Sequence, residues 1–423
     1  MASERIDKAE ALAGLRWLRF GMLAVWGPGL MVMLADTDAG SLITAAQSGA
    51  QWGYWMVLPQ VVLVPILYVV QEMTVRLGIV TGQGHAALIR AWFGHGWARV
   101  SAFTLFATVI GALLTEFAGI AGVGELFSVS RWLTIPVATA ALLALMFTGS
   151  YRRVERIGVA LGAAELAFLV AMVMSGPHLN ALVHGLGSMP LRDRSYLFLL
   201  AANVGAVIMP WMVFYQQGAV VDKQLTVSTI RRERHDTACG AVLTQVIMIA
   251  VMITAATTIG TRSPGASLDS VGQISEALTP YLGPVGGVVG FGVGMLSAAL
   301  VAAIVVTMAG AWALSEVFGW RHTLNQRPDR STAKFYITYA LALIAGAALV
   351  LASANLVTLA IDVEVINALL LPVVVGLLLL LLEAKALPPE WRMRGLRKYS
   401  TWGMCLLVIG FGLYMVPRTL GWI

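Results

Sequence analysis

Two acidic residues, Asp36 and Asp38, lie within a stretch that otherwise has the composition of a membrane-spanning helix. A charge at the centre of a bilayer costs about 2.5–3.5 kcal/mol on insertion scales. On an intact helix the two side chains would point about 200° apart, whereas an unwound segment could aim both into one cavity. The residues that follow, Ala39-Gly40-Ser41, favour such a break. A bound divalent cation would compensate the two charges.

The composition indicates a membrane protein. Of 423 residues, 58% are hydrophobic and only 12% are charged, with a mean hydropathy of +0.80, against about 25% charged residues in soluble domains. The sequence predicts eleven spans of about 20 residues each. Their apolar parts are residues 22–47, 57–70, 100–120, 133–147, 157–174, 197–217, 242–257, 285–314, 337–352, 368–382 and 403–416.

The basic residues predict the orientation. With the N-terminus in the cytoplasm, 23 of the 28 Lys and Arg residues fall on the cytoplasmic side, as the positive-inside rule requires. The C-terminus is then external, and a bacterial inner membrane is the simplest location. Basic loops against an anionic leaflet explain the net charge of +6 without a nucleic-acid partner.

The sequence carries no pattern of an enzyme. A Walker sequence, a Ser/His/Asp grouping and an HExxH motif are all missing, so neither a P-loop ATPase nor hydrolytic chemistry is predicted. The two cysteines, Cys239 and Cys405, suggest neither a disulfide framework nor a metal cluster. We expect no cofactor, and a monomer embedded in the lipid bilayer.

Two of the predicted spans are interrupted. The first is broken at residues 36–41 and the sixth at residues 203–211, which contain Gly205 and Pro210. Breaks five spans apart are typical of transporters built from inverted repeats that hold substrate between discontinuous helices. The chain is therefore predicted as one transporter domain, 1–423. It comprises a cytoplasmic segment (1–19), a first repeat of helices 1–5 (20–177), a second repeat of helices 6–10 (194–383) and helix 11 (400–419).

Five segments resemble the NRAMP family of divalent metal transporters, in order and over residues 20–385. Gly27-Pro28-Gly29 with Asp38-Ala39-Gly40-Ser41 resembles the family's GPG…DPGN first helix, and QEMTVRLGIVTGQGHAALIR (71–90) resembles its Q-x-x-x-A-R-L-G-x-x-T-G segment. GAVIMPWMVFYQQ (205–217) is similar to the sixth-helix pattern G-A-x-x-M-P-H-N. GAWALSEVFGW (310–320) and EVINALLLP (364–372) look like parts of helices eight and ten.

The resemblance implies an all-α integral membrane protein with a LeuT-like fold, a 5+5 inverted repeat and broken helices 1 and 6. It also implies a metal site. Asp38 falls on the family's metal-binding aspartate and Ser41 on its asparagine ligand, while Ala206 would offer its carbonyl and Met209 its thioether. Glu364 falls where many members have a metal-approaching glutamine. Asp36 is an additional charge that we include among the candidate ligands.

The sequence departs from the family's pattern in three ways. DPGN has become DAGS, the histidine after Met-Pro has become Trp211, and the ninth helix contains no arginine. Typical members use such charges to move protons, so proton coupling stays open. The divergence is also similar to that of the magnesium-transporting relatives of the family, although those tend to lose the methionine kept here as Met209.

Each candidate also has a structural interpretation. Asp38, Asp36 and Ser41 could cap or bond the break, Met209 and Trp211 could pack, and Glu364 could pair with Asn203 or Asn367. Glu116 and Glu165 fit buried, protonated groups or a proton or water path. We assign Trp211, Glu116, Asn367 and Asn203 to a gate or pathway.

The ligand types predict the transported ion. Carboxylates suit Mg²⁺ and Mn²⁺, whereas a thioether favours Mn²⁺, Fe²⁺ or softer metals. We therefore expect a secondary transporter that moves Mn²⁺ foremost, with Mg²⁺ or Fe²⁺ as alternatives, by alternating access. A permease for a small cationic organic solute on the same fold is the competing hypothesis.

Overall fold

The computed structural model describes residues 28–148, 150–187, 189–323, 328–353, 355–384, 386–419 and 421. The predicted cytoplasmic segment 1–19 and the first residues of helix 1 (20–27) lie outside this part of the chain. Within the described residues all regular structure is helical.

The first half contains α2 (Pro28–Asp36), α3 (Ala39–Trp52), η1 (Gly53–Met56), α4 (Val57–Thr81), α5 (His85–Leu126), α6 (Arg131–Met146), α7 (Tyr151–Gly162), η2 (Ala163–Leu166) and α8 (Ala167–Met174). The short α9 (Leu179–Leu186) follows. The second half contains α10 (Arg194–Val207), α11 (Pro210–Asp222), η3 (Val227–Thr229), α12 (Ile230–Ala255), η4 (Ala256–Gly260), α13 (Val271–Pro284), η5 (Val285–Gly290), α14 (Phe291–Phe318), α15 (Ala333–Leu351), α16 (Leu356–Glu383) and α17 (Gly395–Thr419).

The helices have the length and composition of membrane spans. In the described residues nine helical stretches are long and apolar enough to cross a bilayer, and Arg131–Met146 is a shorter apolar helix. The longest stretch, Ala39–Thr81, runs through η1 and so contains the outer half of helix 1 together with helix 2. Dividing it at η1 and including α6 recovers the eleven predicted segments in this part of the chain.

Both predicted breaks are present. Helix 1 is interrupted at Thr37 and Asp38, between α2 and α3, where Asp38 is extended (φ −76°, ψ 176°). Helix 6 is interrupted at Ile208 and Met209, between α10 and α11, where Met209 is also extended (φ −80°, ψ 135°). Pro210 begins α11, a place where its missing N–H leaves no hydrogen bond unmade.

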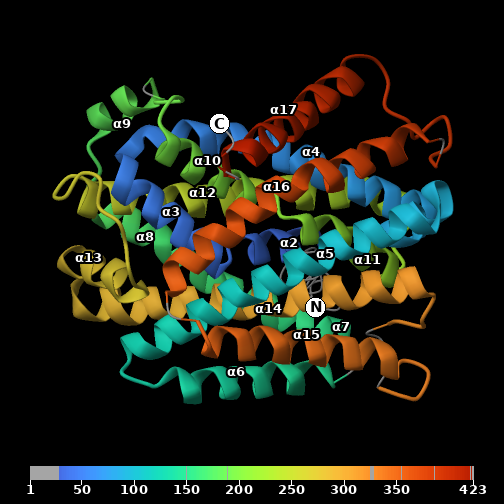
Figure 1. Cartoon of the computed structure of the whole chain (residues 1–423), viewed down its shortest axis with the longest axis horizontal. Coiled ribbons are helices and arrows are strands. Elements are labelled where there is room, and N and C mark those ends of the chain that lie inside the picture. The colour runs from blue at the N-terminus through green and yellow to red at the C-terminus, as the bar shows by residue number, and fades with distance from the viewer. Residues whose placement is uncertain are drawn as a thin grey trace, which may run out of the picture.

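The broken helices form the centre of the molecule. All of α2 and most of α3, α10 and α11 are buried, and α5, α12, α14 and α16 pack around them. In Figure 1 α2 lies near the middle of the view, while α6 and α15 run along its lower edge and α17 along its upper edge. The polar breaks are thereby shielded from lipid by a shell of apolar helices.

Two helix ends coincide with predicted segment boundaries, since α10 begins at Arg194 and α16 ends at Glu383, whereas the last helix of the first half ends at Met174, before the predicted boundary at residue 177. Helix 11 begins earlier than expected, at Gly395 rather than residue 400. The division of the chain into the named segments stays a prediction.

Candidate functional site: the meeting point of two broken helices

Asp38 begins the outer half of helix 1. Its Oδ1 accepts a hydrogen bond from the backbone N–H of Ser41 at 2.6 Å, which makes Asp38 the N-cap of α3. Its second oxygen, Oδ2, is buried and has no hydrogen-bond partner among the described residues. The two interpretations of Asp38 are therefore compatible, because one oxygen caps the helix and the other is free to bind a cation.

The two breaks touch each other through Ser41. Its hydroxyl donates a hydrogen bond to the backbone carbonyl of Ala206 at 3.0 Å, although the two residues are 165 positions apart in the sequence. Ala206 belongs to the last turn of α10, where the carbonyls of a helix have no partner within the helix. The structure thus brings two candidate ligands from different helices into direct contact.

Glu364 reaches the same place from α16, because two glycines leave room for it. A Cβ on Gly40 would lie 2.3 Å from Glu364 Oε1, and a Cβ on Gly205 would lie 1.8 Å from the Glu364 carbonyl oxygen. Glu364 Oε2 accepts a hydrogen bond from Asn367 Nδ2 at 3.0 Å, while Oε1 is buried without a partner in the described chain. Glu364 therefore presents one free carboxylate oxygen to the break in helix 1.

Met209 and Trp211 form a pair in the break of helix 6. Both are fully buried, and the Trp211 indole N–H donates to Met209 Sδ at 3.0 Å. A thioether sulfur has more than one lone pair, so this contact orients the sulfur without preventing it from binding a metal. Trp211 thus positions the Met209 sulfur, and its assignment to a gate stays a prediction.

Asp36 faces a different neighbour from Asp38. It ends α2, and its Oδ2 accepts hydrogen bonds from α12, from Gln245 Nε2 at 3.3 Å and from Thr244 Oγ1 at 3.5 Å. Its Oδ1 is buried and unpartnered among the described residues. Thr244 and Gln245 were not among the predicted site residues, and their only signal in the sequence is a polar pair within an apolar span.

The pathway candidates have structural partners. Glu116 Oε2 accepts a hydrogen bond from Ala39 N at 3.2 Å, so it stabilises the start of α3, and its carboxyl group lies beside that of Asp38. Asn203 Nδ2 donates to Ser48 Oγ at 2.6 Å and to Leu199 O at 2.7 Å. Asn203 and the other asparagine candidate, Asn367, each keep a buried side-chain carbonyl oxygen, Oδ1, that has no hydrogen-bond partner in the described residues.

The candidate ligands do not form a cage of acidic side chains. Across the ranges that the structure describes, no group of three or more His, Cys, Asp or Glu side chains is arranged to hold a metal ion. The predicted ligands are instead a mixed set of oxygen and sulfur donors, of which Ser41 and Ala206 are in direct contact and the Met209 sulfur accepts a hydrogen bond from Trp211. Such a set combines hard oxygen with one soft sulfur donor.

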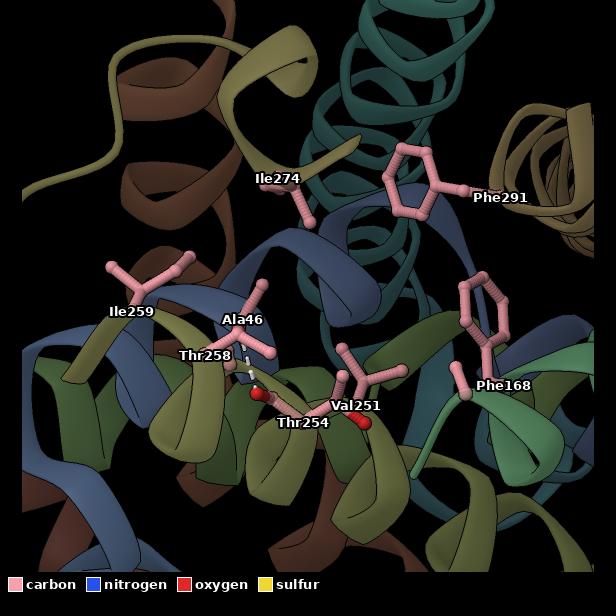
Figure 2. A pocket seen from close by; sticks show the side chains of 10 residues that line it. Ala46, Phe168, Val251, Thr254, Thr258, Ile259, Ile274 and Phe291 are labelled. Carbon is pink, nitrogen blue, oxygen red and sulfur yellow. Dashed lines mark hydrogen bonds between the residues drawn. The ribbon is translucent and has the colours of Figure 1, made fainter. Parts of the chain in front are cut away.

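A small pocket on the α3 side of the break has a different character. Figure 2 shows it lined by apolar side chains, with Phe168 and Phe291 on one side and Ile274 of α13 above. The two threonines labelled there, Thr254 and Thr258, donate their hydroxyls to carbonyls of their own helix. The pocket therefore offers no free polar group for a cation, and none of the predicted ligands lines it.

A family model matches nearly the whole chain. Residues 29–417 match Nramp, described as natural resistance-associated macrophage protein-like. Among curated proteins, the divalent metal cation transporter MntH of Pectobacterium carotovorum is 31% identical over 300 residues, 68% of this chain and 71% of that protein. The MntH of Burkholderia ambifaria is 26% identical over 313 residues, which are 71% and 70% of the two chains.

Solved structures share the fold. The Eremococcus coleocola manganese transporter has a TM-score of 0.75 at 20% identity, covering 94% of this chain and 86% of its own. Mhp1, a nucleobase-cation-symport-1 family transporter, has a TM-score of 0.59 at 14% identity, with 93% of each chain covered. The likeness extends to the Na⁺-coupled sialic acid symporter (TM-score 0.63, 13% identity, 93% and 89% covered). These matches confirm the predicted LeuT-like membrane fold, and with the family match they establish that the chain belongs to the Nramp family.

Proposed function

We propose that this protein transports a divalent metal cation by alternating access, with the ion bound where the two broken helices meet. The observation that carries the proposal is the hydrogen bond from Ser41 Oγ to Ala206 O, which joins the two breaks. Free oxygens of Asp38 and Glu364 lie at the same junction, buried from solvent. Carboxylates placed inside a membrane mark ion pathways, because an uncompensated charge there is costly.

The donor set favours Mn²⁺ as the transported ion. The carboxylates are hard ligands that suit Mg²⁺ and Mn²⁺, and the Met209 sulfur adds affinity for Mn²⁺ and Fe²⁺ over Mg²⁺. The relatives named as divalent metal cation transporters and the structural neighbour named as a manganese transporter support this choice. Magnesium and ferrous ions are the alternatives, with Mg²⁺ favoured if Met209 only packs.

The energy source follows from the charge of the ion. A cation carrying two positive charges gains about 4.6 kcal/mol when it moves inward across 100 mV, at about 2.3 kcal/mol per charge. The membrane potential and the metal gradient can therefore drive uptake with the N-terminus in the cytoplasm, as the basic residues predict. Proton movement is a separate property, which the uptake experiment below measures directly.

Uptake into proteoliposomes tests the proposal. Wild type and Asp38→Ala are compared with Mn²⁺ and Mg²⁺ under an inside-negative potential, while a trapped dye reports internal pH. We expect saturable metal uptake in wild type that is lost in Asp38→Ala. The exposed loop variant Asp269→Ala, which makes the same change outside the membrane core, serves as the control and retains wild-type uptake.

The outcomes separate the two functions that the site could serve. Saturable uptake of either Mn²⁺ or Mg²⁺ identifies a metal transporter, and concurrent acidification adds proton coupling. If folded wild-type protein moves neither ion, the metal proposal fails, and competition by small organic amines then tests the cationic solute permease. An ammonium group could also pair with Asp38 and Glu364, but the Met209 sulfur would be only a weak hydrogen-bond acceptor for it.

A further inference from the structure

Glu165 is a buried acid to which the site described above assigns no role. Its side chain is fully buried, and neither carboxylate oxygen has a hydrogen-bond partner among the described residues. It lies in η2, a 3-10 turn within the fifth membrane span, between α7 and α8. An acid at this depth that is neither paired nor hydrogen-bonded carries the full penalty of burial. Either protonation of the carboxyl group or a bound cation can remove this penalty, and the two have different measurable consequences.

The packing of helix 5 aims Glu165 at the break in helix 1. A Cβ on Gly158 would lie 2.2 Å from Met31 Cε, and a Cβ on Gly162 would lie 2.7 Å from Leu34 Cδ1. These glycines lie one helical turn apart on the same face of α7 and allow it to pack closely against α2. The same face continues to Glu165, whose carboxylate faces the Thr37 side chain in the break. The Thr37 hydroxyl is hydrogen-bonded to the Thr244 hydroxyl at 2.7 Å and still has a lone pair that can bind a cation. The close packing at Gly158 and Gly162 therefore places the Glu165 carboxylate near the end of α2.

The surroundings of Glu165 are negative. The C-terminal end of a helix carries a partial negative charge and several carbonyls without intrahelical partners, and α2 ends at Asp36. The Asp38 carboxylate, whose Oδ2 is buried and unpartnered in the described chain, acts on Glu165 as a second negative charge. The ion pairs that Arg76, Arg131 and Lys223 form in the described chain are with other acids, Glu72, Glu125 and Glu155. A cation is the compensation that fits this arrangement.

We propose that Glu165, with the Thr37 hydroxyl and the carbonyls at the end of α2, forms a second cation-binding station beside the Asp38 site. All of its donors are oxygen, so it suits a hard ion, Mg²⁺ or Mn²⁺, and it lacks the thioether of the first site. The inference rests on the proposed function, because it places the second station on the route of the same ion. An ion leaving the soft donor Met209 would be received by oxygen donors on the α2 side of the break.

Metal binding in a background without the first site tests this station. Detergent-purified Asp38→Ala and Asp38→Ala/Glu165→Gln proteins are titrated with Mn²⁺, and the six-line electron paramagnetic resonance signal reports free ion. We expect Asp38→Ala to retain weak Mn²⁺ binding that the double variant weakens by at least about tenfold, as loss of a carboxylate ligand implies. Adding Glu155→Gln to Asp38→Ala instead removes a carboxylate of α7 that pairs with Lys223, and should leave the residual binding unchanged.

Transport supplies a second readout. In proteoliposomes Glu165→Gln should lower kcat for Mn²⁺ and Mg²⁺ uptake with little change in KM, because the first site is intact. Glu165→Gln removes an unpaired buried charge at nearly constant volume, so its thermal midpoint should equal or exceed that of wild type, which excludes misfolding as the cause.

Two results would overturn the second station. One is Mn²⁺ binding by Asp38→Ala that is unaffected by Glu165→Gln or absent altogether. The other is wild-type kcat in Glu165→Gln, which would mean that Glu165 is a protonated packing residue. If wild type moves no metal, the proposed function fails, and the binding titration still decides the second station by itself.

Discussion

The two helix breaks have the same backbone form but opposite chemistry. In helix 1 the interrupted residues are Thr37 and Asp38, preceded by Asp36, and the break presents carboxylates and hydroxyls. In helix 6 the interrupted residues are Ile208 and Met209, and the break presents a carbonyl and a thioether. The Ser41–Ala206 hydrogen bond joins the two.

From this difference we propose that the two breaks have separate roles in binding a cation and in selecting it. In the proposed site the break in helix 1 would supply the negative charge that attracts a cation, whereas the break in helix 6 would supply the donor that distinguishes one cation from another. Changes in helix 1 should therefore affect whether an ion binds at all, and changes in helix 6 should affect which ion binds.

The largest effect is expected at Asp38. Asp38→Asn keeps an oxygen that can accept from Ser41 N and so preserves the cap, while it removes the charge. We expect a loss of Mn²⁺ affinity of roughly 100-fold, the upper range for changes around a metal site. Isothermal titration measures the affinity. Wild-type affinity in Asp38→Asn would show that the residue only caps α3, and that the charge of helix 1 is dispensable.

The two glycines at the breaks should differ in what they disturb. Gly40→Ala pushes against the end of the Glu364 side chain, which can swing away, so we expect folded protein with roughly tenfold lower uptake. Gly205→Ala places a methyl group against the Glu364 backbone, which cannot move aside. We therefore expect the free energy of unfolding to fall by about 1–3 kcal/mol. Uptake and thermal unfolding are measured on both variants.

Gly376→Ala is the matched control for both glycines, because a Cβ at this position of α16 meets no atom within 4 Å. It should change neither uptake nor stability. Equal behaviour of Gly40→Ala and Gly376→Ala would contradict the close approach of Glu364 to helix 1.

A smaller effect, on selectivity, is expected at Met209. Met209→Leu keeps the volume and removes the sulfur, so the preference for Mn²⁺ over Mg²⁺ should fall by roughly five- to tenfold, or about 1–1.4 kcal/mol. Trp211→Phe removes the N–H that the sulfur accepts and should shift the preference toward Mn²⁺. Competition uptake with both ions measures the ratio, and an unchanged ratio in Met209→Leu would mean that Met209 packs without binding the ion.

The smallest effect is expected at Ser41. Ser41→Ala removes one buried hydrogen bond, worth about 1 kcal/mol, and leaves the Ala206 carbonyl without it. We expect the half-saturating Mn²⁺ concentration to rise by about fivefold at unchanged selectivity. A changed ratio of Mn²⁺ to Mg²⁺ uptake in this variant would contradict the proposal that only the break in helix 6 determines which ion binds.

The sequence was sufficient to predict the breaks but not all of their contacts. Residues that weaken a helix in mid-membrane, such as Gly40 and Pro210, are visible in the sequence, and so is the odd spacing between the two breaks. The partners of Asp36 and Met209 were not predicted. The partners of Asp36 depend on how α12 is rotated against its neighbours, and helices that are apolar all round leave no periodic pattern to fix that rotation. The contact between Met209 and Trp211, two residues apart, depends on how the two side chains are oriented within the break.

Glu165 illustrates the same limit. The sequence shows an acidic residue within an apolar span, but its position alone does not tell whether the carboxyl group is hydrogen-bonded or lacks a partner. Only the approach of Gly158 and Gly162 to α2 places its carboxylate against the break in helix 1.

Manganese X-ray absorption spectroscopy tests the central claim, that one ion lies between the two breaks, most directly. Protein loaded with one equivalent of Mn²⁺ is compared with Met209→Leu and Asp38→Asn loaded identically. We predict a shell dominated by oxygen with one sulfur, loss of the sulfur in Met209→Leu, and in Asp38→Asn only weak residual binding without the sulfur. An all-oxygen shell that is the same in wild type and both variants would place the ion elsewhere and contradict the account.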